Sequence, residues 1–183
     1  MERLTQEHLQ TLDLRLLEWY YVQSDTRHKD LVRVDDAITS RGYLLMTLYY
    51  AILSAAVGYV LTHLHLTDDL PLTYGCLSVI VFTIVAILYV CRVVWPHGYF
   101  APGKEPERFA IPQYAAYFKG HHIDGEAQRK QVLGDELAVI QRKCEEQEAR
   151  NMLRSRQLST SILFLGIGSL AGVAMFLMAA FIL

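Results

Sequence analysis

Three long apolar blocks constrain this chain more than any other feature of its sequence. Residues 43–66 contain no Lys, Arg, Asp or Glu, residues 72–95 contain only Arg92, and residues 158–183 contain none. A helix needs about 20 mostly apolar residues to cross about 30 Å of hydrocarbon, and each block is long enough. The sequence therefore predicts an all-α integral membrane protein with three transmembrane helices.

The distribution of charge predicts the orientation of these spans. The first block follows the charged segment 1–42 and precedes no small-residue cleavage site, so we interpret it as a retained span and not a signal peptide. Basic residues are frequent in 1–42 and 97–157, whereas the short connection between the first two spans carries Asp68 and Asp69 and no basic residue. By the positive-inside rule, the N-terminus is cytoplasmic and the C-terminus lies outside.

Three segments outside the spans are predicted to be cytoplasmic. Residues 1–42 are predicted to form two N-terminal helices, the second capped by Ser24 and Asp25 and running on into the first span. In the first of these helices, an apolar face is expected along Leu9, Leu12, Leu16 and Trp19. The spans 43–66 and 72–95 form an antiparallel hairpin.

The second span is followed by an elbow, 96–125, which is rich in proline and aromatic residues. A stalk helix, 126–157, comes next and is predicted to be continuous with the third span, 158–183, because no strong helix breaker separates them.

The stalk helix carries a heptad-like seam. Its members alternate steps of four and three residues: Leu133, Leu137, Ile140, Cys144, Gln147, Asn151, Arg154 and Leu158. Such a seam packs against another helix. One interpretation is packing against the N-terminal helices of the same chain. The other is a symmetric bundle of several copies in which Gln147, Asn151 and Arg154 line a vestibule.

The third span contains small residues that suit close helix packing. Gly168 and Gly172 have the G-x-x-x-G spacing, which lets helices approach each other in lipid. The same span offers Ser161 and Ser169 as its few hydroxyl groups, so a pore lined by this span would be mostly apolar and would gate by dewetting. We keep both helix packing and pore lining as interpretations of these four residues.

Basic residues near the membrane form a candidate ligand site. In the elbow they are Lys104, Arg108 and Lys119, which are interleaved with aromatic residues, and in the stalk helix they are Arg142, Lys143 and Arg150. Aromatic faces beside cations could stack a base and hold phosphate. The same composition suits attraction to anionic lipid headgroups. Arg92, at the end of the second span, is interpreted as an interfacial anchor.

Signatures of catalysis and of metal binding are not found in the sequence. There is no G-x-S-x-G, no phosphate-binding glycine loop and no H-E-x-x-H. The cysteines and histidines lack metal-ligand spacing, so we predict neither a metal nor a cofactor. No acidic residue lies inside a predicted span, which disfavours a proton-coupled or cation-coupled transporter. The sequence predicts that this protein is not an enzyme.

Two segments carry a resemblance to a known group of proteins. Val-Asp-Asp-Ala-Ile-Thr-Ser-Arg-Gly (34–42) leads into the hairpin, and Trp-Pro-His-Gly-Tyr-Phe-Ala-Pro-Gly-Lys-Glu-Pro (95–106) follows it. This layout resembles small membrane effectors of bacterial anti-phage systems, namely the SLATT-type and Pycsar-type transmembrane effectors and the Hailong channel effector. The third span at the C-terminus departs from the two-span version of these proteins.

The resemblance implies a homo-oligomeric channel, such as a tetramer, or a membrane-disrupting effector in the bacterial inner membrane. It also implies gating by a nucleotide or oligonucleotide that a neighbouring enzyme makes. The alternative hypothesis is a non-conducting membrane interaction protein, such as a toxin-immunity protein or a subunit of a larger complex. The two hypotheses differ in whether the protein carries ions across a bilayer.

Overall fold

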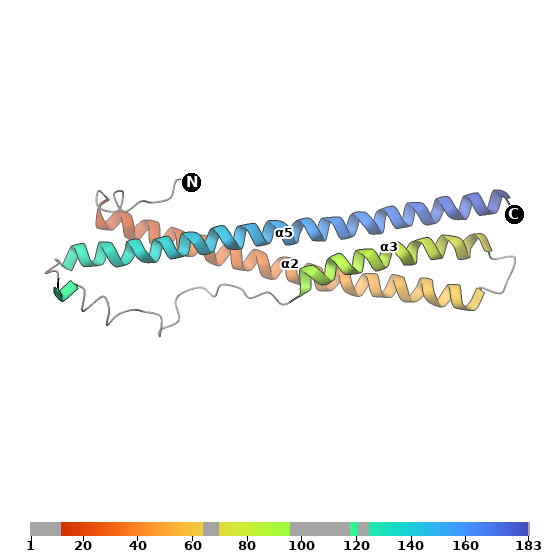
Figure 1. Cartoon of the computed structure of the whole chain (residues 1–183), viewed down its shortest axis with the longest axis horizontal. Helices are drawn as coiled ribbons and strands as arrows, with labels where there is room; N and C mark the ends of the chain where they lie inside the picture. The colour runs from red at the N-terminus through yellow and green to blue at the C-terminus, as the bar shows by residue number, and fades with distance from the viewer. Residues whose placement is uncertain (1–11, 64–69, 96–117, 121–124, 183) are drawn as a thin grey trace. The chain divides into compact units, whose positions relative to one another are not determined.

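The computed structural model describes residues 12–63, 70–95, 118–120 and 125–182. The described residues are helical almost throughout and form three long helices, α2 (Leu14–His63), α3 (Leu70–Val94) and α5 (Gly125–Ile182) (Figure 1). Each of the three contains a stretch long and apolar enough to cross a membrane. The prediction of an all-helical chain with three candidate spans is therefore confirmed.

The predicted boundary between two N-terminal helices is wrong. Helix α2 passes through Ser24 and Asp25 without a break. Asp25 forms an ion pair with Lys29 one turn later, at 2.6 Å, and Thr26 donates a hydrogen bond to the carbonyl of Val22. Serine and aspartate cost only about 0.5 kcal/mol each inside a helix, and no Gly or Pro interrupts the chain there, so their capping preference does not end the helix. The part of the first predicted helix before residue 12 lies outside the described residues.

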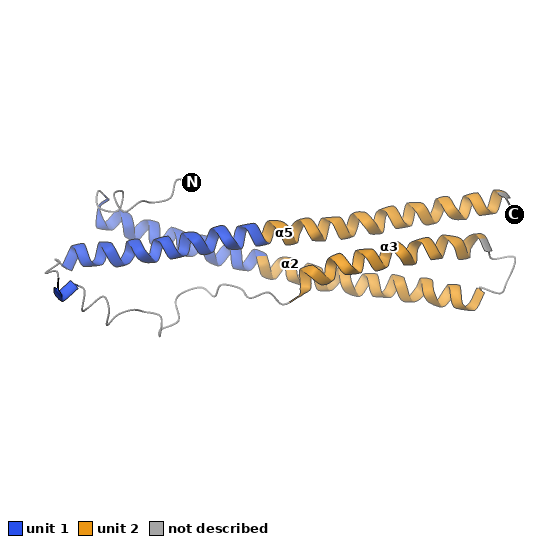
Figure 2. Ribbon diagram, in the orientation of Figure 1, with its two compact units in different colours: residues 1–34, 98–150 blue, residues 35–97, 151–183 orange. Residues whose placement is uncertain are grey.

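Helix α5 covers residues 126–157 and residues 158–182 without a break, as the sequence predicts. It begins at Gly125 and continues to Ile182. The elbow, apart from residues 118–120 and 125, lies outside the described residues. Contacts divide the chain into unit 1, residues 1–34 and 98–150, and unit 2, residues 35–97 and 151–183 (Figure 2). Helices α2 and α5 contribute to both units, and α3 belongs to unit 2.

Unit 1 is a pair of parallel helical segments. Glu18 of α2 pairs with Arg129 of α5 at 2.5 Å, and Arg27 pairs with Glu148 at 2.9 Å. Residue numbers therefore increase in the same direction along both segments. These ion pairs are solvent-exposed and contribute little free energy. The apolar contact between the helices is made by buried side chains, which are Leu17, Leu137, Ile140 and Cys144.

The face of α2 that is buried in unit 1 differs from the predicted one. Leu17 is fully buried, whereas Leu16 and Trp19 are exposed. The buried face follows a heptad of mixed chemistry, whose partly or fully buried members are Leu17, Tyr21, Ser24, His28 and Leu31. Polar residues occupy part of this heptad. Apolar periodicity alone therefore favours the neighbouring stripe, which contains Leu16 and Trp19.

Unit 2 is a bundle of three helical segments. Its core contains Tyr49 of α2 together with Ala86, Ile87 and Val90 of α3. Val93 of α3 contacts Arg154 of α5, whereas Gly75 lies against Gly172. Residue numbers thus run in opposite directions, so α3 is antiparallel to α5 (Figure 1).

The outer surface of unit 2 is apolar. Large exposed side chains occur on every helix of the unit, and they include Leu44, Leu61, Val81, Leu88, Leu163 and Leu170. Water would not favour such a surface, whereas the hydrocarbon of a bilayer has the same polarity as these side chains. The exposed apolar surface of unit 2 therefore fits burial in lipid.

Candidate functional site

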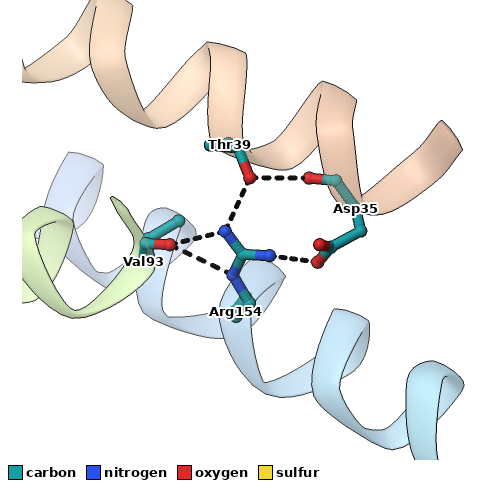
Figure 3. Close-up of polar contacts among 4 residues, drawn as sticks. All are labelled: Asp35, Thr39, Val93 and Arg154. Atoms are coloured by element: carbon teal, nitrogen blue, oxygen red, sulfur yellow. Dashed lines mark hydrogen bonds and ion pairs between the residues drawn. The ribbon is translucent and has the colours of Figure 1, made fainter. Parts of the chain in front are cut away.

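Arg154 is a buried arginine that connects the three helices of unit 2 (Figure 3). It occupies a seam position of α5, and 6% of its surface is exposed. Its Nη1 forms an ion pair with Asp35 of α2. Its Nη2 donates to Thr39 Oγ1 at 2.7 Å and to the carbonyl oxygen of Val93 at 2.6 Å. Its Nε donates to the same carbonyl at 3.1 Å.

The carbonyl of Val93 is a suitable partner for a cation. Helix α3 ends at Val94, so this oxygen is among the last four carbonyls, which have no partner inside the helix. The C-terminus of a helix also carries a partial negative charge, which favours a nearby guanidinium. Arg154 therefore satisfies a free backbone acceptor and stabilises the end of α3.

Thr39 and Asp35 hold Arg154 on its other side. The Thr39 hydroxyl donates to the backbone carbonyl of Asp35 at 2.9 Å, which leaves its oxygen free to accept from Arg154. The side chain of Asp35 is 17% exposed. A buried charge is tolerated when it is paired and hydrogen-bonded, and each partner here meets that condition. We call the set Asp35, Thr39, Val93 and Arg154 the arginine clasp.

The clasp lies where the polar parts of the helices end. Asp35 and Thr39 precede the apolar run of α2, which starts at Tyr43, and Arg154 precedes the apolar run of α5, which starts at Leu158. A change in these contacts would alter how the starts of the apolar runs of α2 and α5 are held to the end of α3.

The three seam residues proposed to line a vestibule are buried within this chain. Gln147 in unit 1 is 1% exposed, and Asn151 and Arg154 in unit 2 are each 6% exposed. A residue that lines a water-filled vestibule must be accessible, and these three are covered by the same chain. The seam instead follows the other interpretation, in which it packs against α2.

Three of the four residues singled out in the third span lie at helix contacts. The Ser161 hydroxyl donates to the carbonyl of Leu158 at 2.7 Å and lies 3.2 Å from the Tyr49 hydroxyl. Gly168 lies against Phe82, and Gly172 lies against Gly75 and Val79 of α3.

Ser169 differs from these three. It is exposed and donates to the carbonyl of Leu165 in its own helix at 3.0 Å. In this chain, Ser161, Gly168 and Gly172 therefore lie at contacts between helices, whereas Ser169 lies on the exposed face of α5.

The candidate ligand site is only partly described. Lys104 and Arg108 lie outside the described residues, and Lys119 is exposed. On α5, Lys143 and Arg150 are seven residues apart and share a face, whereas Arg142 lies about 100° around the helix. Arg142 is exposed and lies 3.9 Å from Glu146. A shared nucleotide site at these residues remains a prediction.

Sequence reasoning missed Asp35 and Thr39 as partners of Arg154. Asp35 continues the heptad of α2 that includes His28 and Leu31, and Arg154 belongs to the seam of α5. Opposite charges on the two seams are therefore the signal that could have identified the pair. Among the described residues, no three His, Cys, Asp or Glu side chains gather as metal ligands would.

His28 is a second buried polar residue, in unit 1. It is 1% exposed, and its Nε2 makes no hydrogen bond in the described part of the chain. Burial and the nearby Lys143 ammonium lower the pKa of His28 below its usual value of 6.5, and the Asp25 carboxylate opposes them in part. The ring is therefore neutral at pH 7 and packs as a mostly apolar group.

This shifted pKa predicts that acid destabilises unit 1. Above pH 6.5 the ring is neutral in both the folded and the unfolded state, so it imposes no penalty. As the pH falls below 6.5, the unfolded state binds the proton first, and stability is lost until the folded pKa is reached. The midpoint temperature of thermal unfolding, measured on the full chain in detergent, should fall more steeply between pH 7 and 5 for the wild type than for His28→Leu.

A second histidine of α2 supplies the control for this prediction. The variant His63→Gln retains His28, so it should keep the wild-type pH profile. Equal slopes for the wild type and His28→Leu would contradict the role given to His28.

Comparison with protein-family models, with curated proteins and with solved structures found no match for this chain.

Proposed function

We propose that this protein is a homo-oligomeric membrane channel or membrane-disrupting effector of bacterial anti-phage defence. In this proposal the apolar parts of α2, α3 and α5 span the inner membrane, with the N-terminus in the cytoplasm. A nucleotide or oligonucleotide signal acts on the cytoplasmic part, and the membrane part responds by passing ions. The arginine clasp is the observation that carries this proposal.

The clasp supports a conformational switch because one side chain, Arg154, makes polar contacts with both of the other helices of unit 2. Arg154 holds α2 through Asp35 and α3 through the carbonyl of Val93. Helices α2 and α5 also continue into unit 1, so the elements joined by the clasp are those that would receive a cytoplasmic signal. A ligand shifts such an equilibrium only by its difference in affinity for the two states. A tenfold shift requires a difference of about 1.4 kcal/mol.

Packing inside unit 2 supports an assembly of several copies. The fully buried Tyr49, Ala86 and Val90 fill the centre of the bundle. A conducting path through one chain would have to displace these side chains, at a cost of several kcal/mol for each large group. A path between copies leaves the core of each chain intact. The exposed face of α5, which carries Ser169, is then a candidate lining in place of the buried face.

Ion flux through liposomes tests this proposal. We expect that liposomes containing the purified protein release a trapped ion, and that Asp35→Asn increases the rate. This isosteric change removes the charge that Arg154 pairs with, so it weakens the clasp while keeping its shape. A loss of about 1.4 kcal/mol would raise the open population about tenfold.

The neighbouring residue provides a matched control for the flux measurement. Asp36 is exposed, so Asp36→Asn removes the same charge without touching the clasp and should leave the flux at the wild-type rate. If Asp35→Asn lowers the thermal stability and neither protein conducts, the clasp exists but the chain is not a channel.

One observation favours the non-conducting alternative. The polar unit 1 exposes an apolar stripe near the start of α2, formed by Leu16, Trp19 and Tyr20. Such a stripe outside the candidate spans suits contact with a protein partner. In that case the protein would bind a toxin or a complex through unit 1, and neither the wild type nor Asp35→Asn would release ions.

A further inference from the structure

Three exposed arginines, one on each helix of unit 2, lie at the level of the arginine clasp. Arg41 of α2 follows Thr39 by two residues, Arg92 of α3 precedes Val93, and Arg156 of α5 follows Arg154 by two residues. Hydrogen bonds join Thr39, Val93 and Arg154, so the neighbouring arginines share their level along the bundle. We call Arg41, Arg92 and Arg156 the arginine belt.

The belt faces outward from unit 2. Two residues along a helix correspond to a rotation of about 200°, so Arg41 and Arg156 point away from the side that carries the clasp. All three belt side chains are exposed, and the exposed acid beside them is Asp36. None of the three forms an ion pair within the described residues, and Arg92 lies 5.9 Å from the centre of the Tyr89 ring.

The belt borders the lipid-compatible surface. Tyr43 and Trp95 are more than half exposed beside it, and the exposed apolar surface begins with Leu44 and Leu88. Tyrosine and tryptophan favour the headgroup level of a bilayer. Arginine at this depth keeps its stem among apolar groups and its guanidinium at the headgroups. The belt therefore has lipid-facing residues on one side and the polar ends of the helices on the other.

We propose that the arginine belt binds the phosphate groups of anionic phospholipids. A guanidinium pairs with phosphate through two parallel hydrogen bonds, and the belt provides three guanidinium groups around the bundle. Among the described residues beside the belt, Asp36 is the one exposed acid against three arginines, so the net charge of these residues attracts anionic headgroups. This inference requires membrane insertion of unit 2, and it does not require that the protein conducts ions.

The position of the three arginines favours a lipid over a soluble phosphate compound as the ligand of the belt. The three arginines lie on three different helices, on the outside of the bundle, beside exposed tryptophan and leucine. A soluble ligand gains little from such a convex apolar surface, since small-molecule sites are concave. Lipid headgroups surround an embedded protein on every side and can contact all three arginines at once.

Quenching of Trp95 fluorescence by brominated lipids tests the proposal. The full chain with Trp19→Phe is placed in uncharged detergent micelles and titrated with brominated phosphatidylglycerol or phosphatidylcholine. One basic residue near an anionic headgroup gives about a fivefold preference. Three arginines opposed by one acid should therefore give about a 25-fold preference for phosphatidylglycerol.

The variant Arg41→Gln/Arg92→Gln/Arg156→Gln should lose the preference for phosphatidylglycerol and bind phosphatidylcholine up to about fivefold better, because only the charge of Asp36 is left. A matched triple variant, Arg15→Gln/Arg33→Gln/Arg142→Gln, removes three exposed arginines of unit 1 and should keep the preference. Circular dichroism checks that each variant retains its helix content. If the belt variant does not fold, Arg92→Gln alone should lower the preference about fivefold.

Three outcomes would overturn the proposal. The belt variant could keep the preference for phosphatidylglycerol, or the unit 1 variant could lose it equally. Soluble glycerol phosphate could also displace the brominated lipid at the same concentration, which would identify the belt as a general phosphate site and not a lipid site.

Discussion

Replacing Arg154 with methionine is expected to lower the free energy of unfolding by about 3–5 kcal/mol, the usual cost of removing one partner of a buried ion pair. The change leaves Asp35 without its counter-charge and the Val93 carbonyl without the hydrogen bonds that Arg154 donates. Methionine has a similar volume and no charge, so the loss of stability reflects the missing polar contacts more than a change in packing. Thermal or denaturant unfolding of the full chain in detergent measures the effect.

The chain supplies a close control for this prediction. Arg156 is exposed two residues further along α5, and Arg156→Met should change the stability by less than about 0.5 kcal/mol. Adding Asp35→Asn to Arg154→Met should restore part of the loss, because the unpaired buried charge is then removed. Equal effects at Arg154 and Arg156, or no recovery in the double variant, would contradict the clasp.

Leucine at Gly168 is expected to separate α3 from α5 and to lower the free energy of unfolding by about 3 kcal/mol, the upper part of the usual range for overpacking. A Cβ at Gly168 would meet the Cβ of Phe82, an atom next to the backbone that cannot move without moving α3. At Gly172, the new atom would lie 3.1 Å from the carbonyl oxygen of Gly75 and 2.9 Å from Val79 Cγ2. Gly172→Leu should therefore have a similar effect, measurable by the same unfolding experiment.

Gly166 is the matched control on the same helix. A Cβ there would meet nothing within 4 Å, so Gly166→Leu should change the stability by less than about 1 kcal/mol, the difference in helix propensity between the two residues. If Gly166→Leu destabilised the protein as much as Gly168→Leu, the assignment of the packed and exposed faces of α5 would be wrong.

The features that were predictable from the sequence depend on composition over many residues. The three apolar blocks predicted the candidate spans, because an apolar run as long as 158–183 is typical of a helix that crosses a bilayer. The absence of a strong breaker between 126 and 183 gave the continuity of α5. The four-three spacing from Leu133 to Leu158 predicted the buried seam of that helix, but it did not identify α2 as the helix against which the seam packs.

The features that were not predictable depend on single pairs of residues. The choice between a packed seam and an open vestibule required knowing that Asp35 of α2 reaches Arg154 of α5. The register of α2 was misjudged because Ser24 and His28 share its buried face with Leu17, so apolar periodicity pointed to Leu16 and Trp19. Local capping preference also failed at Ser24 and Asp25, where a long helix overrides it.

The channel proposal requires that the apolar helices cross a bilayer with the clasp on the cytoplasmic side, and the lipid proposal requires that unit 2 is inserted in a bilayer. Labelling of introduced cysteines by a membrane-impermeant maleimide in intact cells tests this directly, after Cys76, Cys91 and Cys144 have been replaced by serine. We predict that Asp68→Cys is labelled from outside, and that Arg15→Cys and Glu126→Cys are labelled only after the cells are opened. Labelling of Arg15→Cys in intact cells, or protection of Asp68→Cys, would contradict this account.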